Sequence, residues 1–238
     1  SQRPRRFGWL RVAGLAAATA CLLFVAAVNA VPALALSMED VPVLGRIVEV
    51  VTLARFRASS EPQAYGVDIA VPHVQGLADE SLQESLNAQY LADAEARYAA
   101  FMEEIDALAE GELAHKALDA GYEVVVEGDP LLVIRHWVVE TMASGAESVD
   151  YDTIDTARGL VLTLPGLFRD DAYVERISDY LREEMIARTA PEEGIIYFVA
   201  PQDEYGFDGI TADQEFYVNA DHHLVIVFDE YEVAPGAM

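Results

Sequence analysis

The feature that most constrains this chain is the separation of its charges along the sequence. Residues 1–11 contain four arginines and no acidic residue, and residues 12–28 form a run of 17 residues without any charge. A weakly polar stretch continues to Leu36, which makes the whole segment long enough to cross the hydrocarbon core of a bilayer. Because basic flanks favour the cytoplasmic side, we predict a cytoplasmic basic flank over 1–11, a single transmembrane segment over 12–36 and an extracellular remainder.

The chain beyond this segment is strongly acidic. All 41 acidic residues and 11 of the 15 basic residues lie after residue 36, so this part has a formal charge of −30. Such a surface repels nucleic acid and attracts cationic partners over a long range. Since 53% of all residues are hydrophobic, the acidic residues belong to a folded domain and not to a disordered tail. We therefore expect no nucleic-acid partner.

Residue types that carry catalysis or bind metals are scarce in recognisable patterns. Cys21, the only cysteine, lies in the apolar run, which excludes disulfides and thiolate metal sites from the outer part. His222 and His223 are neighbours on an expected strand, where adjacent side chains point to opposite faces, so they do not suit one shared metal ion. The chain has no nucleophile elbow, phosphate-binding loop or zinc-hydrolase motif. We predict no enzymatic activity, no metal and no cofactor.

A cleavage site is expected next to the membrane. Ala35, Leu36 and Ser37 give the small-x-small pattern that signal peptidases accept, and Pro32 interrupts helical structure just before it. We predict a cut between Ser37 and Met38, with a cut between Ala35 and Leu36 as the alternative.

The segment 37–58 is predicted to be an amphipathic juxtamembrane segment that carries this site. Its apolar residues fit one face of a short helix: Val43, Leu44, Ile47, Val48, Val51 and Leu53. Such a helix would rest on the membrane or on the outer domain and would lie over the cleavage site.

Residues 59–238 are predicted to form an extracellular α+β domain with a mostly antiparallel sheet and two main amphipathic helices. Apolar residues at steps of three and four from Leu82 to Leu108 predict a first helix that ends near Gly111, and residues 170–188 fit a second. Residues 122–155 predict three strands separated by short turns, which excludes parallel pairing between them.

Further strand signals follow in the C-terminal half. A short strand is expected before Pro165, and a hairpin over 214–233 with its turn at residues 219–221. Two blocks, 59–156 and 157–238, are candidate lobes. Trp137 and Tyr151 lie on strand patterns, so we expect them in the core more than at a binding surface. The small-residue loops around Ser144 and at the C-terminus are of the kind that carries binding.

Four stretches resemble RsiV-type anti-sigma factors, which inhibit an extracytoplasmic-function sigma factor. They are "VPVLGRIVEVVT", "LNAQYLADAEARYAAF", "LVLTLPGLFRDDAYVERIS" and "FYVNADHHLVIVFDEYEVAPGAM". The resemblance implies a membrane-anchored protein whose outer domain is a receptor for lysozyme, a basic enzyme. Ligand binding would then expose the membrane-proximal site to signal peptidase, after which an intramembrane protease would cut the span and release the sigma factor.

The resemblance also implies where lysozyme would bind. The implied contact residues are Ser144, Asp229, Glu230, Tyr231, Pro235, Gly236 and Ala237. The family pattern suggests an aromatic residue at the position that Ala237 occupies here, so the affinity or the ligand itself is open. The cytoplasmic sigma-binding segment is expected upstream of Ser1 and is absent from the sequence given. The alternative functions are a cell-wall-binding module or peptidoglycan-modifying enzyme of the envelope, or an anchored structural protein.

Overall fold

The structure is a computed structural model that describes residues 48–60, 65–108, 116–141, 145–199 and 206–235. The predicted transmembrane segment and cleavage residues Ala35, Ser37 and Met38 lie outside these ranges, as do the expected contact residues Ser144, Gly236 and Ala237. Within the described ranges, no helix combines the length and the apolar character that a membrane span requires.

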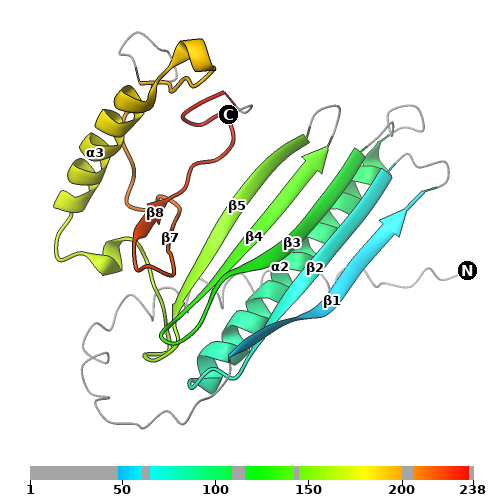
Figure 1. The fold of residues 1–238 in the computed structure, drawn as a ribbon. Helices are drawn as coiled ribbons and strands as arrows, with labels where there is room; N and C mark the ends of the chain where they lie inside the picture. The colour runs from blue at the N-terminus through cyan, green and yellow to red at the C-terminus, as the bar shows by residue number, and fades with distance from the viewer. Residues whose placement is uncertain (1–47, 61–64, 109–115, 142–144, 200–205, 236–238) are drawn as a thin grey trace, which may run out of the picture.

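A six-stranded sheet forms the larger part of the molecule (Figure 1). Its strands are β1 (Glu49–Ser59), β2 (Tyr65–Gln75), β3 (Lys116–Glu127), β4 (Leu131–Thr141), β5 (Gly145–Asp155) and β6 (Leu160–Val161), which pair in chain order. Every neighbouring pair is antiparallel except β2 and β3, which are parallel because the long helix α2 (Glu80–Ala107) connects them. The prediction of an α+β fold with a mostly antiparallel sheet and two main helices is confirmed.

Helix α2 packs along one face of this sheet. Its first turn is closed by Asp79, whose side chain accepts hydrogen bonds from the backbone N–H groups of Ser81 and Leu82 at 2.9 and 3.0 Å. The predicted spacing of its apolar residues is confirmed by burial, and the helix ends at Ala107, four residues before the expected Gly111. Its buried residues are Leu82, Leu86, Tyr90, Ala94, Phe101 and Ile105.

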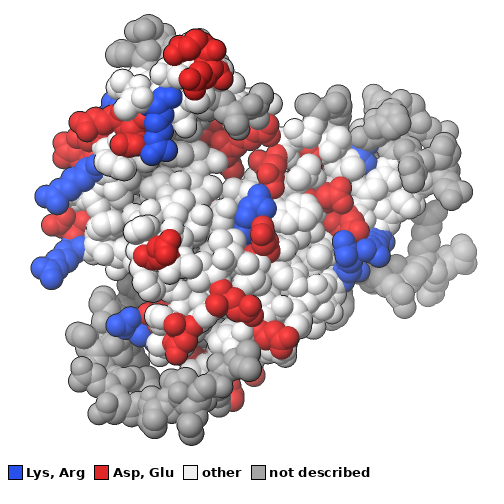
Figure 2. Space-filling model, viewed as in Figure 1, with Lys and Arg blue, Asp and Glu red and all other residues white. Residues whose placement is uncertain are grey.

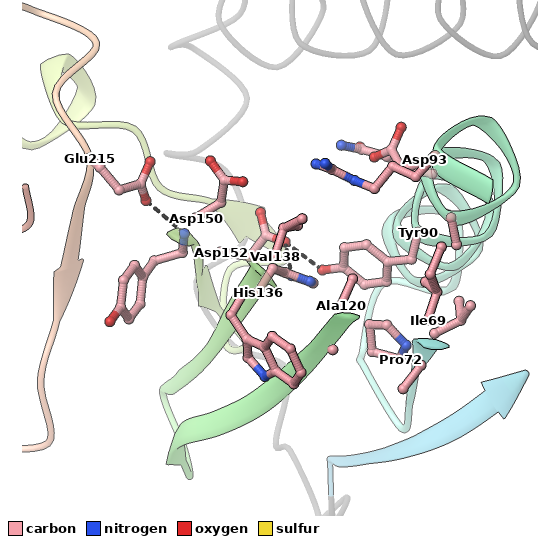
Figure 3. Close-up of a pocket in the computed structure, with 18 residues that line it drawn as sticks. Ile69, Pro72, Tyr90, Asp93, Ala120, His136, Val138, Asp150, Asp152 and Glu215 are labelled. Carbon is pink, nitrogen blue, oxygen red and sulfur yellow. Dashed lines mark hydrogen bonds and ion pairs between the residues drawn. The ribbon is translucent and has the colours of Figure 1, made fainter. Parts of the chain in front are cut away.

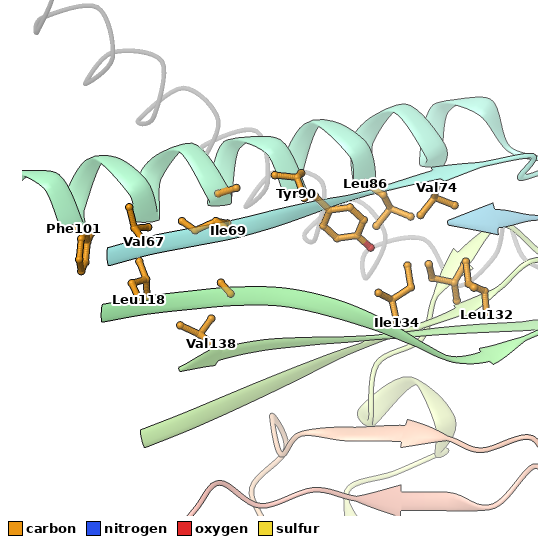
Figure 4. Packing of buried hydrophobic residues seen from close by; sticks show 14 of the residues in the cluster. Val67, Ile69, Val74, Leu86, Tyr90, Phe101, Leu118, Leu132, Ile134 and Val138 are labelled. Carbon is orange, nitrogen blue, oxygen red and sulfur yellow. The ribbon is translucent and has the colours of Figure 1, made fainter. Parts of the chain in front are cut away.

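The main hydrophobic core lies between α2 and the sheet (Figure 4). Alternate residues of each strand point toward the helix, as a period of two requires. They include Val67 and Ile69 on β2, Leu118 on β3, and Leu132 and Ile134 on β4. Burial of these side chains fixes the helix over β2 and β3, which leaves the neighbouring stretch of β4 and β5 available for a functional surface.

One element differs from its prediction. Residues Glu49–Ser59, placed by the sequence in an amphipathic helical segment, form edge strand β1, which pairs antiparallel with β2. Its second half alternates strictly: Ala54 and Phe56 pack against the main core, whereas Arg55 and Arg57 both bind the carboxylate of Asp68 across the strand pair. Tertiary pairing therefore overrides the helical spacing, and the folded unit begins upstream of residue 59.

The C-terminal part has its own small core. It contains helix α3 (Ala172–Arg188), the hairpin of β7 (Phe216–Val218) and β8 (Leu224–Ile226), and two short 3-10 segments at Pro165–Leu167 and Pro191–Glu193. Its buried side chains are Leu164, Tyr173, Met185, Phe207, Ile210, Phe216 and Val233. The second helix and the hairpin are thus confirmed where the sequence predicts them. We refer to this part as the C-terminal unit.

Candidate functional site: an acidic groove

A cavity of about 410 Å³ opens between α2, the sheet and the C-terminal unit. Helix α2, strands β2 to β5 and Glu215, which immediately precedes β7, all contribute to its walls. Carboxylates outnumber basic groups on these walls: Asp93, Asp150, Asp152 and Glu215 line the cavity together with His136 and Arg97. Tyr90 of α2 adds an aromatic side chain to these walls.

The register of the β4–β5 hairpin brings the polar side chains of the floor together. His136 lies directly opposite Asp150, and Asp152 is two residues further along on the same face. The Oδ2 atom of Asp152 accepts a hydrogen bond of 2.8 Å from the Tyr90 hydroxyl and lies 3.0 Å from Nε2 of His136 (Figure 3). Asp152 thereby links α2 to the floor of the cavity.

Helix α2 contributes one carboxylate, Asp93, whose charged form is disfavoured by burial. Partial burial raises the pKa of Asp93, and the positive charge of nearby Arg97 only partly opposes this effect. Figure 3 shows Asp93 on the opposite side of the cavity from Asp150 and Glu215. Negative charges therefore face one another across the opening.

Glu215 forms the wall that belongs to the C-terminal unit. Its Oε1 atom accepts a hydrogen bond of 2.7 Å from the backbone N–H of Tyr151. Burial raises the pKa of Glu215 to about 7, and the negative charges of Asp150 and Asp152 act in the same direction. A bound cation would offset the repulsion among these carboxylates, since a nearby positive charge favours the ionised form of Glu215.

A second hollow of about 270 Å³ continues from the first and shares Asp150 and Glu215 with it. Its other polar walls come from Thr211, Asp213, Gln214, Asp229 and Glu232. No lysine or arginine is among the described residues that line it. We call the two hollows together the acidic groove. On the face shown in Figure 2, acidic side chains are spread over the sheet and the C-terminal unit, and basic side chains lie singly or in small groups between them.

The C-terminal tail borders this groove through a closed turn. Glu232 accepts a hydrogen bond of 2.8 Å from the backbone N–H of Asp229 and donates its own N–H to the Asp229 carbonyl at 3.1 Å. At the tip, Tyr231 has a φ of 69° and is 63% exposed. A tyrosine in the left-handed region with so exposed a ring is strained and is not used for packing, which is typical of a residue kept for binding.

The structure places the predicted contact residues in different surroundings. Asp229 lines the acidic groove, Glu230 and Tyr231 are exposed on the tail turn, and Pro235 is half-buried at the end of the described chain. Their direct contact with a ligand stays a prediction.

The cavity residues were not found from the sequence. Trp137 and Tyr151, expected in the core, are only half-buried, and the Tyr151 ring stacks on that of Tyr217 with centroids 4.6 Å apart. The Trp137 ring lies across Gly121, where a Cβ atom would be only 2.7 Å from the ring atom Cζ2. The Asp150-x-Asp152 spacing on a strand is the one local signal of this site, because it places two carboxylates on the same sheet face as His136.

Metal chemistry has no support among the residues that the structure describes. No three His, Cys, Asp or Glu side chains there are placed to hold a metal ion together. His222 occupies the tip of the β7–β8 turn with a φ of 61°, held by a hydrogen bond from its N–H to the Asn219 carbonyl. The carboxylates of the groove suit it to binding cationic groups of a partner.

Sequence comparison with known proteins identifies a relative and a family profile. The chain is 35% identical over 223 residues to the anti-sigma-V factor RsiV of Bacillus subtilis (strain 168), covering 94% of this chain and 76% of that protein. The sequence profile of the family described as "Protein of unknown function (DUF3298)" matches residues 166–238.

Solved structures of two DUF3298 proteins are similar to this chain to different degrees. A crystal structure of a DUF3298 family member from Bacteroides fragilis superposes with a TM-score of 0.57 at 19% identity, over 80% of this chain and 87% of that chain. A DUF3298 protein from Pseudomonas aeruginosa gives a TM-score of 0.48 at 12% identity, over 84% of this chain and 87% of that chain. The first supports the overall fold alone, and the second is too distant for any argument.

Proposed function

The chain belongs to the family of the anti-sigma-V factor RsiV, and on this premise we propose that it is a membrane-anchored anti-sigma factor whose outer domain is a receptor for lysozyme. In this proposal a single span over residues 12–36 places the acidic domain outside the cell. A cytoplasmic segment holds an extracytoplasmic-function sigma factor at the membrane. Lysozyme binding outside starts the proteolysis that releases it, and the protein itself catalyses no reaction.

The observation that carries the receptor proposal is the acidic groove beside the exposed tail turn. Asp150, Asp229 and Glu232 line a hollow whose described walls lack a lysine or arginine. A strongly basic enzyme is complementary to such a surface, and the complementarity speeds encounter as well as orienting the partner. Tyr231, exposed at the rim of the same region, offers an aromatic anchor.

Lysozyme is expected to bind the purified outer domain with an affinity that falls about tenfold between low and moderate salt, because exposed charges are screened within a Debye length. Isothermal titration at two ionic strengths measures this. Absence of binding at both would exclude lysozyme as the ligand.

A charge-matched pair of variants locates the binding surface. The double variant Asp150→Asn, Asp229→Asn should weaken binding at low salt, because both carboxylates line the groove. The control is Glu175→Gln, Glu183→Gln, which removes the same charge from exposed positions on α3 that do not line it. Equal loss of affinity in both variants would mean that net charge alone attracts lysozyme and that the groove is not its site.

Proteolysis gives a separate prediction for the membrane-proximal segment. We expect lysozyme to trigger a cut between Ser37 and Met38, or alternatively between Ala35 and Leu36, because these positions follow the small-x-small pattern. N-terminal sequencing of the domain released from membranes, with and without lysozyme, identifies the bond. A new end within β1 or beyond would contradict both positions, since it would cut into the folded sheet.

Once the outer domain is shed, the remaining span becomes the substrate of an intramembrane protease in this proposal. The sigma factor would then leave the membrane together with the cytoplasmic fragment. Reporter transcription that depends on lysozyme and is lost when Ser37 is replaced by a large residue, Ser37→Trp, would connect the cut to sigma release.

A further inference from the structure

Strand β5 has an outer edge that is largely unpaired. Figure 1 shows β5 as the last long strand of the sheet on the side of the C-terminal unit. Within the described part of the chain, β6 pairs with this edge only at Ile154 and Asp155. The preceding segment, from Gly145 to Tyr151, has β4 as its partner on the inner side only.

The backbone groups that point outward can be assigned from two hydrogen bonds. The N–H of Tyr151 is directed away from β4, because it donates to Oε1 of Glu215, and the carbonyl of Thr153 accepts from the N–H of Leu162. Outward and inward residues alternate along an antiparallel strand, and the β4–β5 register runs without a bulge. The N–H and C=O groups of Glu147 and Val149 therefore point outward as well.

This edge lacks the devices that natural proteins use to block edge pairing. It has no proline, lysine or bulge between residues 145 and 151. The one charged side chain on an outward-pointing residue, Glu147, is held 2.6 Å from Arg135 of β4 and so lies over the sheet. Residues 145–148 are exposed, and Val149 is half-buried at the wall of the acidic groove.

The charges around the edge select the kind of strand that could be added. Val149 and Asp150 form one wall of the smaller hollow, and Asp213, Asp229 and Glu232 form the other. An extended segment laid along β5 would place alternate side chains in this hollow, since side chains of a strand alternate between its two faces. Basic side chains would find carboxylate partners there.

We propose that the outer edge of β5 at Glu147 and Val149 receives an extended basic segment of the cationic protein partner as an added antiparallel or parallel strand. Main-chain hydrogen bonds to the two outward residues would give the register, and basic side chains would enter the acidic groove. The added strand would end before Tyr151, because the outward N–H of Tyr151 already donates its hydrogen bond to the Glu215 carboxylate. The inference rests on the proposed function in that lysozyme is taken as the partner.

The decisive variant is Val149→Pro, compared with Val149→Ala. Proline removes the outward N–H and is tolerated on an edge strand where that N–H faces solvent, so the β4–β5 pairing is kept. We expect Val149→Pro to weaken lysozyme binding about tenfold at low salt. Val149→Ala loses the side chain but keeps the N–H, so it should bind several-fold more tightly than the proline variant. Equal affinities of the proline and alanine variants for lysozyme would contradict the inference that a strand is added at this edge.

Amide hydrogen exchange of the full outer domain gives a second measurement that does not depend on the folding of a variant. On addition of lysozyme, the amides of Glu147 and Val149 should become slow to exchange. Those of Ser148 and Asp150, already directed toward β4, should change little. A complex that forms without this alternating protection contradicts the inference and leaves the receptor proposal intact, whereas failure of the unchanged domain to bind lysozyme removes the receptor proposal itself.

Discussion

Replacing Ile134 by alanine is expected to lower the free energy of unfolding by about 2–5 kcal/mol, the range for deleting a fully buried branched side chain from a packed core. Ile134 has an exposed fraction of 0% and belongs to the main core between α2 and the sheet. It lies on β4 two residues before His136, on the same face. The cavity that the substitution leaves would also loosen the floor of the acidic groove.

Urea denaturation followed by circular dichroism measures this effect, provided that the slope of the transition is unchanged. The matched control is Ile186→Ala on α3, because that isoleucine is 58% exposed and its removal should cost less than about 0.5 kcal/mol. A similar loss at both positions would mean that Ile134 is not part of a close-packed core.

Local patterns predicted the elements whose faces differ sharply in polarity. Helix α2 was predictable because Leu82, Leu86 and Tyr90 recur at the helical period and all three are buried. The β4–β5 hairpin was predictable because turn residues separate two runs that contain β-branched and aromatic residues, the types favoured in strands. In both cases the local pattern and the tertiary burial agree, so single-sequence reasoning suffices.

Strands β1 and β2 show where that reasoning fails. The apolar residues of the segment before Ala54 fit a helical face, yet pairing with β2 holds this stretch extended. Strand β2 itself was not identified, since its run from Val67 to Val74 is interrupted by Pro72 and follows a linker-like stretch. Its parallel pairing with β3 depends on the crossover through α2, which is a property of the whole fold.

The acidic groove was unpredictable for a different reason. In a chain with 41 acidic residues, sequence alone gives no means of choosing the few that converge. Asp93, Asp152 and Glu215 come from a helix, a strand and a loop that are far apart in the sequence, and only the register of the sheet and the position of the C-terminal unit bring them together. The tail turn was easier to predict as a candidate binding segment, because its residues are consecutive in the sequence.

Glu215→Gln is expected to stabilise the domain at pH 8 by about 2 kcal/mol and to have almost no effect at pH 4. Burial raises the pKa of Glu215 from its ordinary value of 4.5 to about 7. The folded protein therefore holds a proton that the unfolded chain has already released between these pH values, so stability falls as the pH rises through this window. Each pKa unit corresponds to about 1.4 kcal/mol, and partial solvent access reduces the full effect to the value given.

Glutamine keeps an oxygen that accepts the Tyr151 N–H and carries no charge, so the difference between the variant and the unchanged protein isolates the cost of ionisation. Thermal denaturation of both proteins between pH 4 and pH 8 should give curves that coincide at the acidic end and separate above pH 5. Asp213→Asn is the control: it lies on the same hollow, but hydrogen bonding to Thr211 lowers the pKa of Asp213, so its removal should bring no gain at pH 8. If Glu215→Gln followed the unchanged protein at every pH, the carboxylate would be solvated like an ordinary surface acid. The junction between β5 and the C-terminal unit would then not be the place where the acidic groove concentrates its unfavourable charge.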